Sequence, residues 1–77
     1  MPWGLNTAQT AEIEAGLLRA HAHGDTRTLV SLYTEAATEA PPDAAAFLLT
    51  QAWVYALSAG DPRAKTLSET LAAMGRA

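Results

Sequence analysis

Glycine and proline divide the 77-residue chain into four segments of helical length. The breaks stand at Gly24, at Pro41-Pro42 and at Gly60, and Gly75 lies close to the end of the chain. Glycine adopts the left-handed backbone that ends a helix, and proline lacks the N–H that a continuing helix needs. Short connections force consecutive helices to pack as antiparallel hairpins. The pattern therefore predicts an all-α fold of two antiparallel helical hairpins (four helices), either repeat-like or a four-helix bundle.

Apolar residues recur at steps of three and four within each segment, as expected for helices with one buried face. Asp25 stands where it can cap the second segment, and Asp61-Pro62 combines a capping residue with a proline suited to a first turn. Alanine, the best helix former, occurs in all four segments. We expect a single helical domain over residues 1–77, with helices at about 7–23, 26–39, 42–59 and 62–74.

The third segment is apolar around most of its circumference. A helix of this kind is usually buried on several sides, so we expect residues 42–59 to form the central helix. On that basis Leu49→Ala or Leu57→Ala should cost roughly 2–5 kcal/mol of stability. Trp53 lies in the same segment, and the sequence leaves open whether it belongs to the core or to an exposed interaction surface.

Charge and hydropathy exclude several classes of partner. The chain has a net charge of −3 with only five lysine and arginine residues, whereas nucleic acids and anionic membranes attract clustered cations. Its apolar runs are far shorter than the roughly 20 residues that cross a bilayer. The first residues also lack the basic and apolar regions of a signal peptide. We therefore expect no nucleic-acid or membrane partner and a cytoplasmic location.

The sequence contains no recognisable catalytic or metal-binding motif. There is no cysteine, and the two histidines, His21 and His23, are two residues apart, so they point to different sides of a helix. A helical metal site would use histidines four residues apart. We expect no catalytic residues, no metal ligands, no cofactor and no enzymatic activity. A small-ligand-binding or enzymatic domain with a pocket around Trp53, Tyr55 and His21 is an alternative.

A four-residue pattern, Gly-Asp-x-Arg, occurs at residues 24–27 and again at residues 60–63. The offset of 36 residues falls in the range typical of helical repeat proteins. An arginine in the first turn of a helix is mildly unfavourable because its charge opposes the helix dipole. Its occurrence after both turns therefore suggests a specific interaction. We expect Arg27 and Arg63 to pair with neighbouring carboxylates, and an anion-binding site is the alternative.

The second half of the chain carries part of a known repeat motif. Ala52 is followed three positions later by Tyr55, and Ala64 stands on the next helix. The sequence therefore resembles the tetratricopeptide repeat family and its relatives over almost its whole length. It departs from that pattern at Arg19 and Thr28, which replace the tyrosine and alanine in the first unit, and in its period, which is about 34 residues in the family.

The resemblance implies a non-catalytic protein–protein interaction module that binds a helix or peptide of unknown identity. In such a module the first helix of each hairpin lines a shallow groove. A self-associating structural domain, covered by a second copy of itself, is the alternative. The residues assigned to the interaction surface by the resemblance are Thr10, Ile13, Leu17, His21, Leu49, Trp53 and Leu57.

Overall fold

The computed structural model describes residues 7–76, with side chains from residue 11 onward. It contains four helices and no strand within that range: α1 (Thr7–His23), α2 (Thr26–Thr38), α3 (Pro42–Ala59) and α4 (Arg63–Ala73). The all-α prediction is confirmed. The bounds of α1 and α3 agree with the expected ones. Those of α2 and α4 differ by one residue, at the end of α2 and at both ends of α4.

Both hairpin turns have the same backbone geometry. Gly24 and Gly60 lie in the left-handed region, with φ of 64° and 66°. In each turn the next residue donates its N–H to the carbonyl five residues earlier, at 2.8 Å. This arrangement satisfies a carbonyl that the end of a helix would otherwise leave unpaired. The repeated Gly-Asp sequence is thus a repeated helix stop.

The two aspartates after these glycines act differently. Asp25 is the N-cap of α2, and its carboxylate accepts the N–H of Thr28. Asp61 accepts the N–H of Arg63 instead, with Pro62 as the N-cap of α4. The second helix of the second hairpin therefore begins one residue later than the capping pattern predicts.

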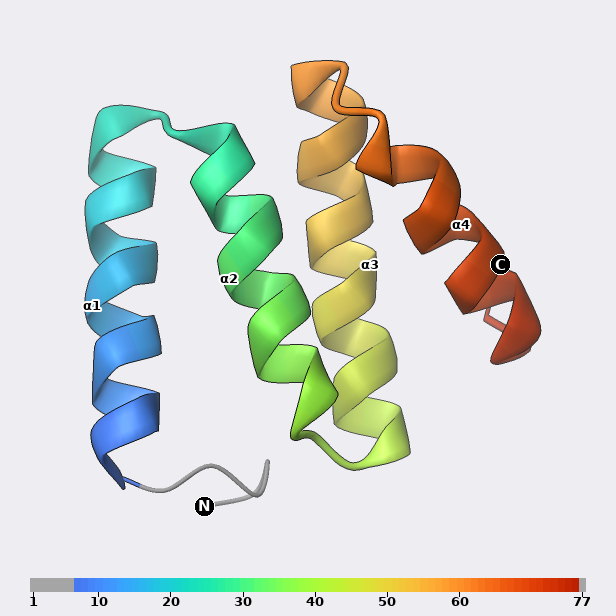
Figure 1. The fold of residues 1–77 in the computed structure, drawn as a ribbon, viewed down its shortest axis with the longest axis horizontal. Coiled ribbons are helices and arrows are strands. Elements are labelled where there is room, and N and C mark those ends of the chain that lie inside the picture. Colours follow the sequence, from blue (N-terminus) through green and yellow to red (C-terminus); the bar gives the residue numbers. More distant parts are fainter. Residues whose placement is uncertain (1–6, 77) are drawn as a thin grey trace.

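The helices form an open layer in chain order (Figure 1). α2 packs against α1 and α3, and α3 packs against α2 and α4. The Cα atoms extend over 31 × 29 × 12 Å, so the domain is less than half as thick as it is wide. Within the described residues α1 and α4 do not pack against each other. A layer of this kind leaves two broad faces open to solvent.

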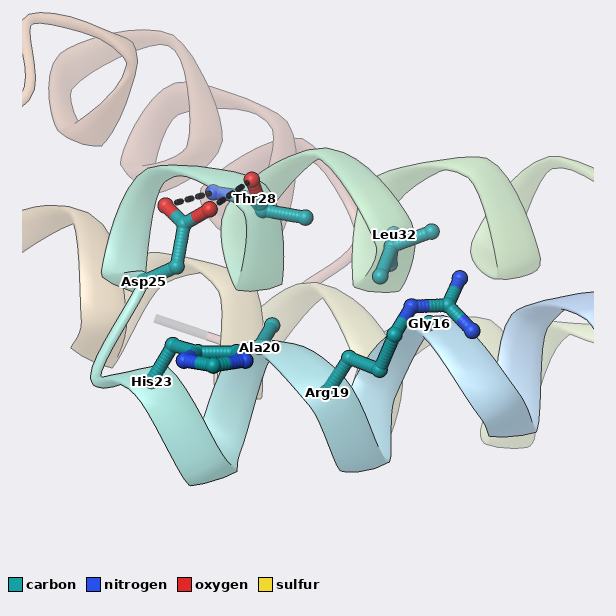
Figure 2. Close-up of a pocket in the computed structure, with 7 residues that line it drawn as sticks. All are labelled: Gly16, Arg19, Ala20, His23, Asp25, Thr28 and Leu32. Carbon is teal, nitrogen blue, oxygen red and sulfur yellow. Dashed lines mark hydrogen bonds between the residues drawn. The ribbon is translucent and has the colours of Figure 1, made fainter.

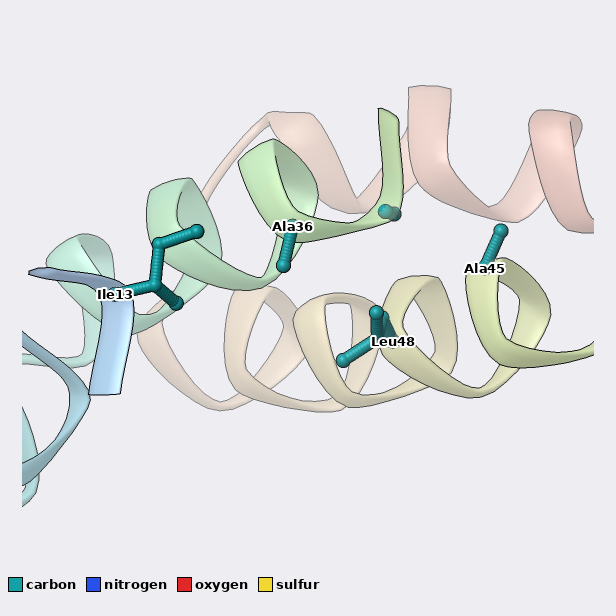
Figure 3. Close-up of a cluster of buried hydrophobic side chains, with 5 residues drawn as sticks. Ile13, Ala36, Ala45 and Leu48 are labelled. Carbon is teal, nitrogen blue, oxygen red and sulfur yellow. The ribbon is translucent and has the colours of Figure 1, made fainter. Parts of the chain in front are cut away.

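Two small clusters of buried side chains hold the layer together. The first joins α1, α2 and α3, and most of it is seen in Figure 3. The second joins α2, α3 and α4. Alanine supplies half or more of each cluster and permits close approach of the helix backbones. The first cluster contains Ile13, Ala36, Ala37, Ala45 and Leu48, and the second contains Val30, Ala52, Ala56 and Leu67.

The sequence predicted a central helix buried on several sides, and α3 meets this expectation only in part. α3 does pack on two sides, but Phe47, Val54 and Leu57 are exposed. A helix inside a layer is covered by neighbours at its flanks and remains open on a face. The large stability cost expected for Leu57→Ala therefore has no structural basis, whereas Leu49 is partly buried and packs against both clusters.

Candidate functional site

Among the described side chains, the large hydrophobic residues that remain exposed all lie on α1 and α3. Leu18 on α1 is 72% exposed, and Phe47, Val54 and Leu57 on α3 are 60%, 49% and 56% exposed. Single exposed apolar residues are common, and larger contiguous groups of them often mark interaction sites. These four residues are the starting point of the candidate site.

The three exposed large hydrophobic residues of α3 lie on one line along the helix, together with the partly buried Thr50. Phe47, Thr50, Val54 and Leu57 are separated by three, four and three positions, a spacing that keeps side chains on one face. The hydroxyl of Thr50 donates to the carbonyl of Ala46 at 2.8 Å, so its polar group is satisfied within the helix. We call these four residues the α3 stripe. Its spacing is that of a coiled-coil seam.

A shallow hollow on the flank of α1 adds a second apolar element. Its volume is about 360 Å³, and α2 contributes the side chain of Tyr33 to its lining. The side chains from α1 are two leucines, a histidine and a glutamate. The hollow, which we call the α1 hollow, is lined by Glu14, Leu17, Leu18, His21 and Tyr33.

Aromatic contacts fix the α1 hollow relative to α3. The ring of His21 meets the ring of Tyr55 edge to face, with centroids 5.7 Å apart, and Tyr55 stacks on Tyr33 at 5.8 Å. Burial, and to a lesser degree the proximity of Tyr55, raises the pKa of Tyr33 above its usual value, so its hydroxyl stays uncharged at neutral pH. The three rings connect α1 to α3 across α2.

The structure separates the residues that the sequence assigned to the interaction surface. Leu17 and His21 line the α1 hollow, and Leu57 belongs to the α3 stripe. Thr10 lies on α1, but its side chain is outside the described part of the chain. The other three assigned residues face the interior.

Ile13, Leu49 and Trp53 are part of the packing between helices. Ile13 is buried in the first cluster, Leu49 packs against both clusters, and Trp53 packs against the second. Trp53 is partly buried, and it is not among the exposed large hydrophobic residues. Because Trp53 and Tyr55 are two positions apart on one helix, they point to different sides of α3, and His21 meets the ring of Tyr55.

Leu18, Phe47 and Val54 are the exposed residues that sequence reasoning missed. The sequence placed Phe47 and Val54 in an all-round apolar core helix, because periodicity cannot show which side of such a helix stays open. Leu18 follows Leu17 in the sequence but lies outside the apolar stripe of α1, so the periodicity did not single it out. The unusual width of apolar surface on α3 is the one feature that pointed to Phe47 and Val54.

Two other hollows lie between neighbouring helices. The first, beside the α1–α2 turn, is shown in Figure 2; its lining includes Arg19, His23 and Asp25. The carboxylate of Asp25 accepts from the hydroxyl of Thr28 at 2.6 Å and from its N–H, and these bonds lower the pKa of Asp25. Its acidic group is therefore engaged in capping α2.

The second hollow lies between α2 and α4, and threonines make up much of its lining. The hydroxyls of Thr34 and Thr38 donate to carbonyls of their own helix at 2.7 Å, and Thr70 does the same at 3.0 Å. With their hydroxyls satisfied in this way, these side chains add little hydrogen-bonding capacity to the hollow.

Asp61, which is buried, and Arg63, which is half-exposed, form a clamp between α4 and α2. The guanidinium of Arg63 donates to the carboxylate of Asp61 at 2.5–3.1 Å, and it also reaches Ser31 and the carbonyl of Arg27. Asp61 is 6% exposed. The expected pairing with a carboxylate is confirmed for Arg63. The side chain of Arg27 makes no such pair within the described residues.

The clamp predicts a specific pH dependence of stability. The hydrogen bonds from Arg63 lower the pKa of Asp61 from 3.8 to about 2. Because the folded-state pKa lies below the unfolded one, the contribution of Asp61 is complete above pH 4 and is lost as the pH falls toward 2. Asp61→Asn should therefore be less stable than wild type at pH 6, and the gap in thermal midpoint should narrow toward pH 3. A gap in thermal midpoint that stays constant with pH would contradict the clamp. The capping carboxylate of Asp25 is the same in both proteins, so it cannot cause the difference between them.

The described residues contain no group of three or more histidine, cysteine, aspartate or glutamate side chains placed to hold a metal ion. None of the helices over residues 7–76 combines the length and hydropathy needed to span a bilayer.

Comparisons with protein-family models, with curated proteins and with solved structures find no match. The functional argument for this chain therefore rests on its own surface.

Proposed function

We propose that this domain is a non-catalytic protein–protein interaction module that binds a helix or peptide through the apolar face of α1 and α3. The observation that supports this proposal is the confinement of exposed large hydrophobic residues to these two helices. Apolar surface that remains in water gains free energy when another molecule covers it. The α3 stripe and the α1 hollow together provide the surface that such a partner would cover.

The form of the surface favours a helical partner. Side chains at steps of three and four on one helix interlock with the same steps on another, which is the basis of helix-to-helix docking. The α3 stripe offers this spacing over eleven positions, from Phe47 to Leu57. A peptide that binds by adding a strand would instead require an open sheet edge, and the described residues form helices and no strand.

The proposed relationship to tetratricopeptide repeats is compatible with this assignment. The two hairpin turns have the same geometry 36 residues apart, and in a repeat module the first helix of each hairpin lines the groove. α1 and α3 are those first helices. The groove residues we propose, however, are Leu17, Leu18 and His21 with the α3 stripe, in place of Ile13, Leu49 and Trp53.

The proposal is tested by selecting displayed peptides of helical length on the purified domain. Val54→Lys should weaken binding of the selected peptides at least about tenfold, since a lysine buried against an apolar partner loses its hydration. The matched control, Ala72→Lys, places the same charge on an exposed position of α4 and should bind like wild type. Selected peptides that bind wild type and Val54→Lys equally well would contradict the proposal.

A further inference from the structure

We infer that the α1 hollow receives a helix of another protein that carries a lysine or arginine, two apolar residues and an acidic residue at positions i, i+3, i+4 and i+7. The inference rests on the proposed function, because it names the chemistry of the partner that covers α1. It is carried by the order of the side chains along α1, by the apolar surface between its charged ends and by the distribution of charge over the layer.

The side chains that α1 contributes to the hollow share one face of the helix. Glu14, Leu17, Leu18 and His21 are separated by three, one and three positions, which brings all four to the same side. Glu14 and His21 are exposed, and within the described residues neither forms an ion pair. This face therefore has an acidic end and a histidine end, about two helical turns apart, with two leucines between them.

The two leucines give the apolar residues of a partner a place to pack. Leu17 is partly buried and lines the hollow together with Tyr33 of α2. Leu18, on the same hollow, is strongly exposed. An apolar side chain that enters the hollow would contact Leu17 and Tyr33 and would also cover Leu18. Adjacent apolar residues at i+3 and i+4 of a partner helix match this arrangement, because they lie on one face with residues i and i+7.

The charge of the whole layer has the same polarity as this face of α1. Six of the eight carboxylates lie in the half of the layer that holds the connection from α2 to α3, and four of the five lysine and arginine residues lie in the half with the hairpin turns (Figure 1). Arg76 is the exception, and its guanidinium pairs with Asp43 at 2.6 Å. The six carboxylates belong to Glu12, Glu14, Glu35, Glu39, Asp43 and Glu69, and the four cations to Arg19, Arg27, Arg63 and Lys65.

This polarity selects among apolar helices. A partner with a cation beside Glu14 and an acidic residue beside His21 is attracted at both ends, whereas a partner with the same charge at both ends is repelled at one of them. Exposed ion pairs add little affinity, but unfavourable like-charge contacts exclude wrong partners. A second copy with its α1 antiparallel is the competing occupant. It offers Glu14 a histidine, whereas a lysine or arginine carries a full positive charge at neutral pH.

Three designed peptides test the inference. They share one helical sequence of alanine and glutamine with two adjacent leucines, and they differ only at positions i and i+7, which are lysine and glutamate, two lysines or two glutamates. By fluorescence anisotropy at low salt, the peptide with lysine and glutamate should bind the wild-type domain at least about threefold more tightly than either same-charge peptide. The preference should disappear at high salt, which screens exposed charges.

A charge reversal in the domain gives the sharper result. Glu14→Lys should bind the peptide with two glutamates most tightly, because both ends of the α1 face then favour an acid. The matched control, Glu39→Lys, makes the same change at an exposed position between α2 and α3 and should keep the wild-type order. Equal binding of the three peptides, or an unchanged order in Glu14→Lys, would overturn the inference. A wild-type dimer in light scattering that no peptide dissociates would assign the face to a second copy and would overturn it as well.

The results also separate this inference from the proposed function. Peptides from the selection that bind wild type and Glu14→Lys equally well would reject the charge pattern and leave the proposed function standing. Charge-dependent binding of the designed peptide that Val54→Lys leaves unchanged would confine the interface to α1 and reject the part proposed for α3. A domain that binds no peptide, selected or designed, would reject both.

Discussion

Leu48→Ala is expected to lower the free energy of unfolding by about 2–5 kcal/mol. Leu48 is 3% exposed and belongs to the cluster that joins α1, α2 and α3 (Figure 3). The substitution removes apolar contacts and leaves a cavity between three helices. Because the total stability of a small domain is itself only about 5–15 kcal/mol, the variant should be largely unfolded at moderate temperature. Chemical denaturation followed by circular dichroism measures the change.

Leu57→Ala is the matched control for this prediction. It makes the same chemical change on the same helix, but Leu57 is exposed in the monomer. Measured at concentrations where the chain is monomeric, its effect should stay within about 0.5 kcal/mol, as for most surface substitutions. Equal losses in the two variants would mean that α3 is covered on the side we describe as open.

Gly16→Leu is expected to destabilise the domain by about 1–3 kcal/mol through overpacking between α1 and α2. Gly16 is buried, and a Cβ at this position would lie 3.0 Å from Cδ1 of Leu32. Both residues are seen in Figure 2. Leucine is a better helix former than glycine by under about 1 kcal/mol, which offsets only part of the clash. Thermal and denaturant unfolding give the net effect.

The compensating change gives this prediction its control. Leu32→Ala removes the side chain that Gly16→Leu would strike, and alone it should also destabilise the domain by opening space at the same crossing. Together the two changes exchange the large and small partners, so the double variant should be more stable than the sum of the single losses indicates. Strictly additive losses would show that the two residues do not meet.

The number and bounds of the helices followed from the sequence because local chemistry determines them. Gly24 and Gly60 adopt the left-handed backbone that ends a helix, and Pro42 occupies the first turn of α3. α4 begins one residue later than predicted because the carboxylate of Asp61 accepts a hydrogen bond from the N–H of Arg63. Arg63 also reaches Ser31 and the carbonyl of Arg27 on α2, and no local pattern encodes those contacts.

The candidate site was only partly predictable. Assigning the surface to the first helix of each hairpin agrees with where the exposed apolar residues lie, but the individual residues on α3 largely differ. Periodicity identified α3 as apolar all round, and only the arrangement of its neighbours decides which side is covered. Trp53 faces the interior because α4 packs on its side of α3, whereas Val54 faces solvent.

The central claim is that the apolar face of α1 and α3 is where this domain contacts other proteins. The most direct test is to titrate the ¹⁵N-labelled domain with the tightest peptide from the selection and to follow the backbone amides by NMR. We predict that the largest shifts fall on the amides around Leu18 and along the α3 stripe. Shifts concentrated instead on the hollow between α2 and α4, around Thr34 and Leu67, would contradict the claim.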